Sequence, residues 1–154
     1  MSFEQLVAVI RSLNTDDAFR VRLDNSQWKA FGAYLSHQQI RPGDVIIRQG
    51  STDRQAYFLG EGMMQVYLKT AEPGSRVAIL RAGAMFGEAG MFSQGERMAN
   101  VEAMTPCLLW VLHLTRFEEL AQRMPAIALE VLRGAAGVMA SRMRANLSKR
   151  LPLA

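Results

Sequence analysis

The sequence predicts a mainly β fold, a sandwich or barrel of short strands with helices at both ends. Between His37 and Leu114, runs rich in Val, Ile, Leu, Phe and Tyr are repeatedly interrupted by glycine, a rhythm typical of an antiparallel sandwich or barrel. On either side, apolar residues recur every three or four positions, the period of an amphipathic helix. The length of 154 residues fits one domain spanning 1–154, with N-terminal helices (1–36), a strand region (37–114) and C-terminal helices (115–150).

Three short helices are expected before the strands. The first begins at Ser2, which can form a capping box with Gln5. Residues 14–17 interrupt the helical pattern and offer N-caps for a second short helix over 19–23. Ser26 is a candidate start for the third.

Six strands are expected in the central region. Their boundaries are 45–48, 56–59, 64–69, 76–80, 98–103 and 107–112. Residues 72–75 combine Glu, Pro, Gly and Ser, which favours a hairpin turn between the third and fourth of these strands.

The C-terminal part returns to helix. Thr115 and Glu118 can form a second capping box, and Pro125 suits the first position of a longer helix that ends near Lys149. Gly134 would weaken this helix by about 1 kcal/mol. Gly137 would do the same, and either glycine can mark a kink or a close crossing. An apolar series with three- and four-residue steps predicts a seam for another helix: Leu129, Leu132, Ala136, Met139 and Met143, followed by Asn146.

Charge and cysteine content narrow the class of protein. The formal net charge is +4, a modest excess that gives little support for nucleic-acid binding, and the late basic residues are expected on a solvated helix face. The single cysteine, Cys107, lies in an apolar run and is expected to be a buried structural thiol in a reducing compartment. Neither a secretory leader nor an apolar run of about 20 residues is recognisable, so we expect a cytoplasmic protein without membrane insertion.

The sequence offers no recognisable catalytic or metal-binding constellation. Ser93 and Ser141 have no histidine nearby, and the acidic residues form no obvious acid–base pair. His37 and His113 lack the spacing of a metal-binding barrel. We therefore expect a binding protein, with no enzymatic activity, metal or cofactor.

The most informative stretch is 86–92 together with 96–101. A strand ends at Phe86, a short helical turn follows, and an arginine returns before the next strand. Gly87 allows close approach of the backbone to an anion, and the first N–H groups of a helical turn can donate to phosphate oxygens. Arg97 can add charge and a planar fork of donors. Glu88 would repel a phosphate but can accept a hydrogen bond from a sugar hydroxyl.

These residues closely resemble the cyclic nucleotide-binding domain family, which includes the bacterial catabolite activator protein and the regulatory subunits of protein kinase A. The similarity extends from about Leu35 to Asn146. Three segments carry it in the family's order: 41–50, 57–62 and 86–101. The resemblance implies an eight-stranded β-roll, or jelly roll, with N-terminal helices and a C-terminal helical lid, an α+β arrangement dominated by strands.

The resemblance also implies roles for individual residues. Arg97 would pair with the cyclic phosphate and Glu88 would accept from the ribose 2′-hydroxyl, while backbone N–H groups near Gly87, Ala89 and Ala99 complete the cradle. The apolar side of the purine would be lined by Leu80, Val77 and Phe86. The long helix would close over the base, with Arg142 or Asn146 as edge contacts.

Three departures from the family pattern bear on ligand and output. Met98 follows the arginine where a hydroxyl residue is associated with cyclic GMP in some members, which favours cyclic AMP, although Met98 can also crowd the site. Ala89 replaces a common leucine and gives the turn a smaller anchor. The sequence stops soon after the long helix, where relatives carry an output domain, although a fragment of a larger regulator or channel is an alternative.

Two functional interpretations follow. The first is a sensor of a cyclic mononucleotide, cyclic AMP or else cyclic GMP, with a cyclic dinucleotide not excluded by the sequence. Binding would rearrange the C-terminal helices, which act on a second copy of the chain or on a separate effector protein. The alternative is a dimerisation or scaffold module whose site is vestigial.

Overall fold

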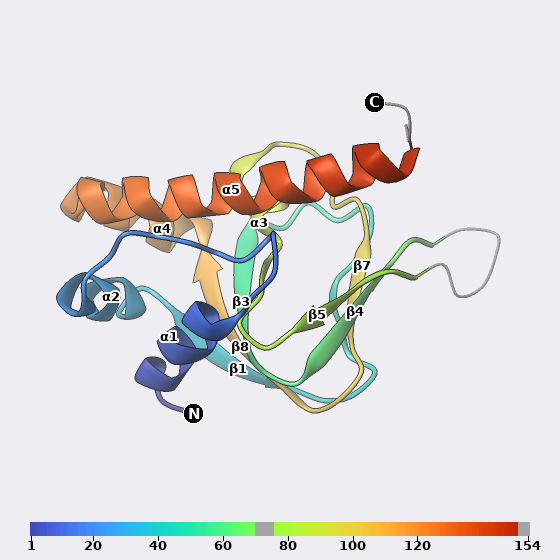
Figure 1. The fold of residues 1–154 in the computed structure, drawn as a ribbon, viewed down its shortest axis with the longest axis horizontal. Coiled ribbons are helices and arrows are strands. Elements are labelled where there is room, and N and C mark those ends of the chain that lie inside the picture. Colours follow the sequence, from blue (N-terminus) through green and yellow to red (C-terminus); the bar gives the residue numbers. More distant parts are fainter. Residues whose placement is uncertain (70–75, 151–154) are drawn as a thin grey trace.

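The computed structural model describes residues 1–69 and 76–150, and the side chains of 76, 77, 149 and 150 are not described. Two helices precede the strands and two follow them, while a fifth, very short helix lies between strands (Figure 1). The helices are α1 (Phe3–Ser12), α2 (Asn25–Gly32), α3 (Glu88–Phe92), α4 (Leu114–Arg123) and α5 (Pro125–Arg150). The strands are β1 (Ser36–Ile40), β2 (Val45–Ile47), β3 (Gln55–Glu61), β4 (Met63–Tyr67), β5 (Arg76–Arg81), β6 (Met85–Phe86), β7 (Asn100–Ala103) and β8 (Cys107–His113).

The eight described strands form two four-stranded antiparallel sheets, which confirms the predicted β-roll. One sheet has the order β1-β8-β3-β6 and the other β2-β7-β4-β5. Strand β8 is central in the first sheet, with Gln38 opposite Leu109 on one side and Tyr57 opposite Val111 on the other. Strand β7 is central in the second sheet, so the segment that follows the 86–99 region is held between two neighbours.

All six predicted strands are present, with boundaries shifted by one or two residues. Strands β1 and β6 were not among them. Strand β1 reads Ser-His-Gln-Gln-Ile and is exposed at every position except Ile40, so it lacks the apolar alternation that identifies a half-buried strand. Strand β6 has only two residues. The predicted turn at 72–75 lies outside the described residues.

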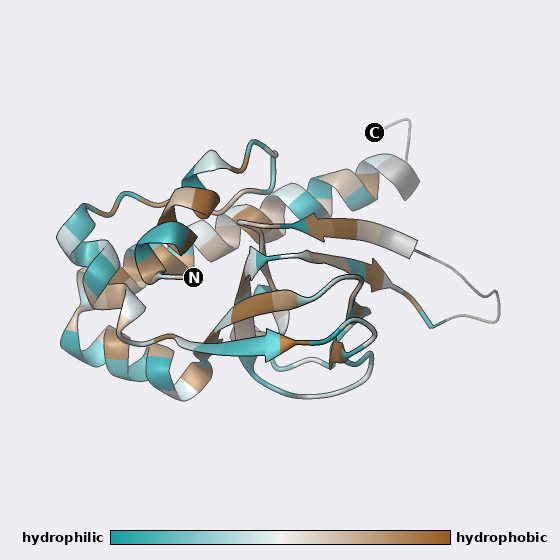
Figure 2. Ribbon diagram, turned by 90° about the horizontal axis from the view of Figure 1, so that it is seen from below, coloured by the Kyte–Doolittle hydropathy of each residue, from teal (hydrophilic) through white to brown (hydrophobic). Residues whose placement is uncertain are grey.

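Alternation along β3 and β8 builds two separate hydrophobic clusters. Leu59 and Leu109 point between the two sheets, into the interior of the roll. Phe58 and Trp110 point to the other face of the first sheet, where helices cover them. In Figure 2 apolar and polar residues alternate along these helices, and the apolar ones include those that pack on this sheet. Because successive residues on one strand point to opposite faces, the first sheet contributes one face to the interior of the roll and the other face to the packing of the helices.

The first predicted helix and its capping box are confirmed, but the second predicted helix is wrong. Helix α1 begins after Ser2, whose hydroxyl accepts from the backbone N–H of Gln5. Residues 18–24 form no helix. Their apolar side chains stand two apart rather than three or four, and a spacing of two suits extended chain. Phe19 is buried against Phe58, with 5.0 Å between the ring centroids.

The helix expected to begin at Ser26 is α2, which starts slightly earlier. Asp24 is the N-cap, and its carboxylate accepts from the backbone N–H of Gln27 while the Gln27 side chain accepts from the N–H of Asp24. Helix α4 follows His113 directly without a side-chain cap. The capping box predicted at Thr115 is therefore wrong, because Thr115 lies inside the helix.

The long helix α5 confirms the predicted start at Pro125 and runs on to Arg150. Gly134 marks a close approach, although the neighbour is the extended N-terminal segment rather than another helix. A Cβ added at Gly134 would lie 2.5 Å from Cε1 of Phe19 and 2.7 Å from Cγ1 of Val21. Gly137 is exposed, and its Cβ would meet nothing within 4 Å. Helix α5 crosses above the two sheets and passes over α3 (Figure 1).

A search of the described residues finds no helix with the length and apolarity that a bilayer crossing requires. Cys107 is buried, as predicted. Burial raises the pKa of its thiol, which keeps the thiol protonated and unreactive at neutral pH.

The two glycines of α5 give a matched test of this packing. Alanine favours helix over glycine by about 1 kcal/mol at either position. At Gly134 the added methyl collides with Phe19, which is itself buried, so Gly134→Ala should be less stable than Gly137→Ala by about 1–3 kcal/mol. Urea unfolding followed by tryptophan fluorescence measures both. Equal gains in stability at the two positions would contradict the close approach.

Candidate functional site

The candidate site begins at the turn between β6 and α3. Gly87 is the N-cap of α3 and has a φ of 80°, a left-handed conformation that suits glycine. A side chain there would also approach the carbonyl oxygen of Gln55, since a Cβ would lie 3.0 Å from it. The predicted sequence of strand, glycine and one short helical turn is thus present, and Glu88 and Ala89 are the first residues of α3.

Arg97 is buried beneath this turn, with its side chain 3% exposed. Its Nη1 donates to the carbonyl oxygen of Gly87 at 2.6 Å, and its Nη2 donates to that of Gln55 at 2.6 Å. The guanidinium also fills the space beside Gly90, where a Cβ would lie 2.4 Å from Nη1. Gly90 therefore provides room for Arg97 within α3.

Asp53 supplies the charge partner of Arg97. The two side chains form a bidentate pair, with Nη2 to Oδ2 at 2.6 Å and Nε to Oδ1 at 3.1 Å. The hydroxyl of Ser51 donates to Oδ1 of Asp53 at 2.9 Å. Backbone hydrogen bonds bring the two loops together, from the Arg97 N–H to the Ser51 carbonyl and from the Gly50 N–H to the Arg97 carbonyl, both at 2.8 Å.

Sequence reasoning missed Asp53. It lies 44 residues before Arg97 in an irregular loop, and no local spacing relates the two. The only signal was indirect, because the 41–50 segment of the family pattern ends just before this loop. The hydrogen bond from Arg97 lowers the pKa of Asp53 below its ordinary value of 3.8, and this outweighs the opposing effect of burial.

Glu88 is also buried and already paired. Its Oε1 lies 3.0 Å from Nη1 of Arg142 on α5, and the Glu88 side chain is 5% exposed. Burial raises the pKa of Glu88, while the charge of Arg142 acts in the opposite direction. Arg142 therefore touches the acid of the predicted site, where the sequence had suggested an edge contact to a purine.

The other predicted site residues divide into two groups. Phe86 and Leu80 are buried in the interior of the roll, and the Phe86 ring stacks on Tyr57 with 5.0 Å between centroids and 14° between planes. Met98 is 74% exposed, so its side chain points away from the buried pair below α3. Asn146 is also exposed on α5.

Three predicted residues complete the account. Ala89 and Ala99 are partly buried on either side of the 90–98 segment. Val77 belongs to β5, but its side chain is not among those that the structure describes. The structure thus brings together Gly87, Glu88, Arg97 and Arg142, and leaves Met98 and Asn146 at the surface.

The charges of Arg97 and Glu88 are already matched by other side chains of the protein. Arg97 and Glu88, the charged residues expected to bind the phosphate and the ribose, each have a protein partner of opposite charge. A phosphate or a sugar hydroxyl would have to join or replace these contacts. Among residues 1–69 and 76–150, no three His, Cys, Asp or Glu side chains are grouped so that they could hold a metal ion.

Removing the partner of Arg97 gives a prediction about pH. Asp53→Asn should lower the free energy of unfolding at pH 7 by about 1–3 kcal/mol, less than for a fully buried pair because Asp53 is about one-third exposed. The wild-type advantage depends on ionised Asp53, whose folded pKa is depressed. It is therefore complete above about pH 4 and is lost as the pH falls through the folded pKa.

Urea unfolding of both proteins between pH 7 and pH 2 measures this difference. Asp16→Asn, at an exposed aspartate, is the control. A wild-type advantage that stays constant down to pH 2 would show that the Asp53 charge contributes nothing.

Comparison with known proteins identifies the domain. A sequence profile described as the cyclic nucleotide-binding domain matches residues 37–124. Among curated proteins, the human potassium/sodium hyperpolarization-activated cyclic nucleotide-gated channel 3 is 33% identical over 91 residues. The mouse channel 2 is 34% identical over 91 residues. Each match covers 59% of this chain, but the chain spans only 11% and 10% of the respective channels.

Solved structures share the fold. A cyclic nucleotide-binding domain from Methylobacillus flagellatus superposes with a TM-score of 0.83 at 20% identity, covering 99% of this chain and 84% of that one. The catabolite activator protein of Thermus thermophilus gives a TM-score of 0.70 at 25% identity, covering 84% and 60%. The regulatory domain of Toxoplasma gondii protein kinase A, crystallised with cyclic AMP, gives 0.64 at 21% identity, covering 76% and 43%.

The profile match covers more than half of the chain, and it includes the Gly87 turn, Glu88 and Arg97. The two-sheet roll, with helices before and after it in the chain, agrees with the fold of the solved relatives. This chain belongs to the cyclic nucleotide-binding domain family.

Proposed function

We propose that this chain is a regulatory sensor of a cyclic mononucleotide, with cyclic AMP as the ligand. The observation that carries the proposal is the Gly87 turn, which holds Arg97 and Glu88 beside each other at the end of β6. Arg97 would bind the cyclic phosphate and Glu88 the ribose 2′-hydroxyl. Backbone N–H groups near Gly87, Ala89 and Ala99 would donate to the remaining phosphate oxygens.

The choice of cyclic AMP rests on Met98 and on the relatives. Met98 lacks the hydroxyl that is associated with cyclic GMP in some members of the family, and its side chain is exposed rather than packed against Arg97. The Toxoplasma gondii structure holds cyclic AMP, and the channels are named for cyclic nucleotides. Cyclic GMP is the competing ligand, with the larger cyclic dinucleotides as a third class. Phe86 and Leu80, together with Val77, are the apolar residues proposed to face the base.

Output is proposed to pass through α5, because this helix contacts the site through Arg142 and also presents an unpartnered apolar side. Three large apolar residues of the predicted seam are exposed on α5, namely Leu129, Leu132 and Met143, and Leu147 is exposed four residues further along the helix. A second copy of the chain would cover this seam with the same residues, which is the arrangement of a symmetric dimer. A separate effector protein is the alternative partner.

We propose a regulatory rather than a catalytic role, in keeping with the relatives, which are named as channels, an activator and a kinase regulatory domain. A cytoplasmic location belongs to this proposal. It is supported by Cys107, a buried thiol with no disulfide partner.

One observation favours a second function. Because Arg97 is paired with Asp53 and Glu88 with Arg142, the structure satisfies its own site without a ligand. A dimerisation or scaffold module with a vestigial site would have the same contacts. Nucleotide titration separates the two functions.

Isothermal titration of the full chain with cyclic AMP and cyclic GMP tests the sensor. We expect cyclic AMP to bind, and Arg97→Lys to weaken binding at least about tenfold, because a single ammonium cannot reproduce the donors of a guanidinium. Arg133→Ala, at an exposed arginine of α5, should bind like the wild type. Thermal melting shows whether the Arg97→Lys variant is folded. The absence of binding to either nucleotide would leave the scaffold function.

Sedimentation velocity tests the proposed dimer. We expect the wild type to dimerise and a double variant, Leu129→Arg with Met143→Arg, to be monomeric, because two buried charges on each copy would face each other across the seam. Gln122→Arg, at an exposed position on α4, should remain dimeric. A wild-type chain that stays monomeric with and without cyclic AMP would exclude the second copy as the partner.

A further inference from the structure

Arg142 is the contact between the long helix and the candidate site, and all of its described hydrogen bonds converge on one place. Nη1 lies 3.0 Å from Oε1 of Glu88, Nη2 donates to the carbonyl oxygen of Met85 at 2.6 Å, and Nε donates to Oδ2 of Asp17 at 3.0 Å. One side chain thus joins α5, strand β6, the first residue of α3 and the N-terminal segment.

The Glu88 carboxylate is inaccessible while Arg142 occupies this position. The Glu88 side chain is 5% exposed, and the guanidinium of Arg142 covers it from the side of α5. An incoming sugar hydroxyl needs an oxygen of Glu88 to accept its hydrogen bond. The hydroxyl must therefore displace Arg142 from Glu88, because the carboxylate is otherwise buried beneath the guanidinium.

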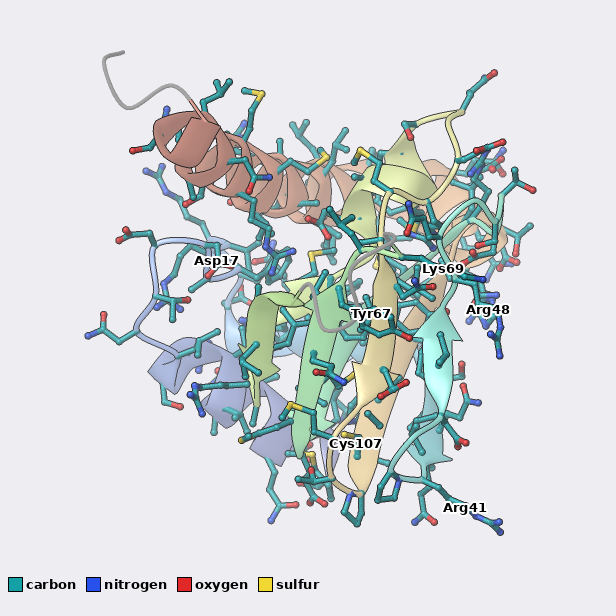
Figure 3. All side chains as sticks on the ribbon, turned by 90° about the vertical axis from the view of Figure 1, so that its right-hand side faces the viewer. Asp17, Arg41, Arg48, Tyr67, Lys69 and Cys107 are labelled. Carbon is teal, nitrogen blue, oxygen red and sulfur yellow. The ribbon has the colours of Figure 1, made fainter. Side chains whose placement is uncertain are left out.

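The structure leaves space for the Arg142 side chain if it is displaced from Glu88. Beside it, an open cavity of about 600 Å³ lies between α5 and the N-terminal segment. Its polar lining consists of Asp16, Asp17, Ser141, Arg142 and Arg144. Figure 3 shows Asp17 on the N-terminal segment next to α5, at the end of the roll away from Cys107.

Asp17 is suited to keep Arg142 after the exchange. Burial acts to raise the pKa of Asp17, but hydrogen bonds from Thr15 and Arg142 outweigh it, so Asp17 stays ionised at neutral pH. The segment that carries Asp17 is itself anchored, since Phe19 is buried and packs against Gly134 of α5. Arg142 can therefore leave Glu88, enter the cavity and retain one carboxylate partner.

We propose that Arg142 is an internal competitor for Glu88, so that the chain holds its own nucleotide site closed until a ligand hydroxyl replaces the guanidinium. This inference rests on the proposed function and adds a mode of regulation to that site. It reverses the role expected from the sequence, in which Arg142 would contact the bound purine. Only molecules in which Glu88 is free can bind, so the apparent dissociation constant equals the intrinsic one divided by the fraction of such molecules.

The test is isothermal titration of cyclic AMP into the full chain and three variants. Arg142→Gln should bind about tenfold more tightly than the wild type, which corresponds to about one molecule in ten being open beforehand. Arg142→Lys should give a smaller gain, because it keeps the charge but not all three contacts. Arg144→Gln, on the same helix and lining the same cavity, should bind like the wild type, because among the described residues Arg144 has no ion pair.

The outcomes are distinguishable. Tighter binding by both Arg142 variants, and not by Arg144→Gln, supports the competitor. Weaker or unchanged binding by Arg142→Gln, in a protein that melts cooperatively, overturns it and leaves the sensor function intact. If Arg142→Gln fails to fold, Arg142→Lys decides in the same way. If neither the wild type nor any variant binds cyclic AMP or cyclic GMP, the proposed function falls and the competitor falls with it.

Discussion

The burial of Arg97 under α3 is the constraint on which the rest of the site depends. A guanidinium removed from water is costly unless its charge and its donors are matched, and here Asp53 and two backbone carbonyls match them. These partners come from the loop before β3, from β3 itself and from the turn after β6. Arg97 therefore joins its own loop to two other segments, residues 53–55 and the turn at Gly87, and Gly87 and Gly90 leave the space that its side chain needs.

The two ion pairs make ligand binding an exchange of partners rather than the filling of an empty site. Arg97 is held by Asp53 and Glu88 by Arg142, so a nucleotide gains only the difference between its own contacts and those it replaces. The same exchange provides a physical link to α5. A ligand that needs Glu88 changes what Arg142 contacts, and Arg142 connects the roll to the N-terminal segment as well as to the helix.

Some local patterns were misread for physical reasons. Apolar residues two apart around Phe19 belong to extended chain packed on α5, and β1 is too polar to show a strand pattern. The prediction of a capping box at Thr115 was wrong because α4 begins directly after β8, one residue before the proposed N-cap. For the Phe19 segment and for β1, a neighbour distant in sequence decided the local conformation, which short-range propensity does not register.

The sequence by itself determined six of the strands, most of the flanking helices, and the Gly87 turn with Glu88 and Arg97 beside it, because alternation, glycine conformation and short-range spacing are local properties of a chain. The arrangement of the strands as a roll followed from the family resemblance. Only the tertiary structure decided which residues pair with that acid and that arginine. Asp53 lies 44 residues from Arg97, and Arg142 lies 54 residues from Glu88. Contacts over such separations depend on how the loops and α5 pack against the sheets, and no periodicity in the sequence encodes that packing.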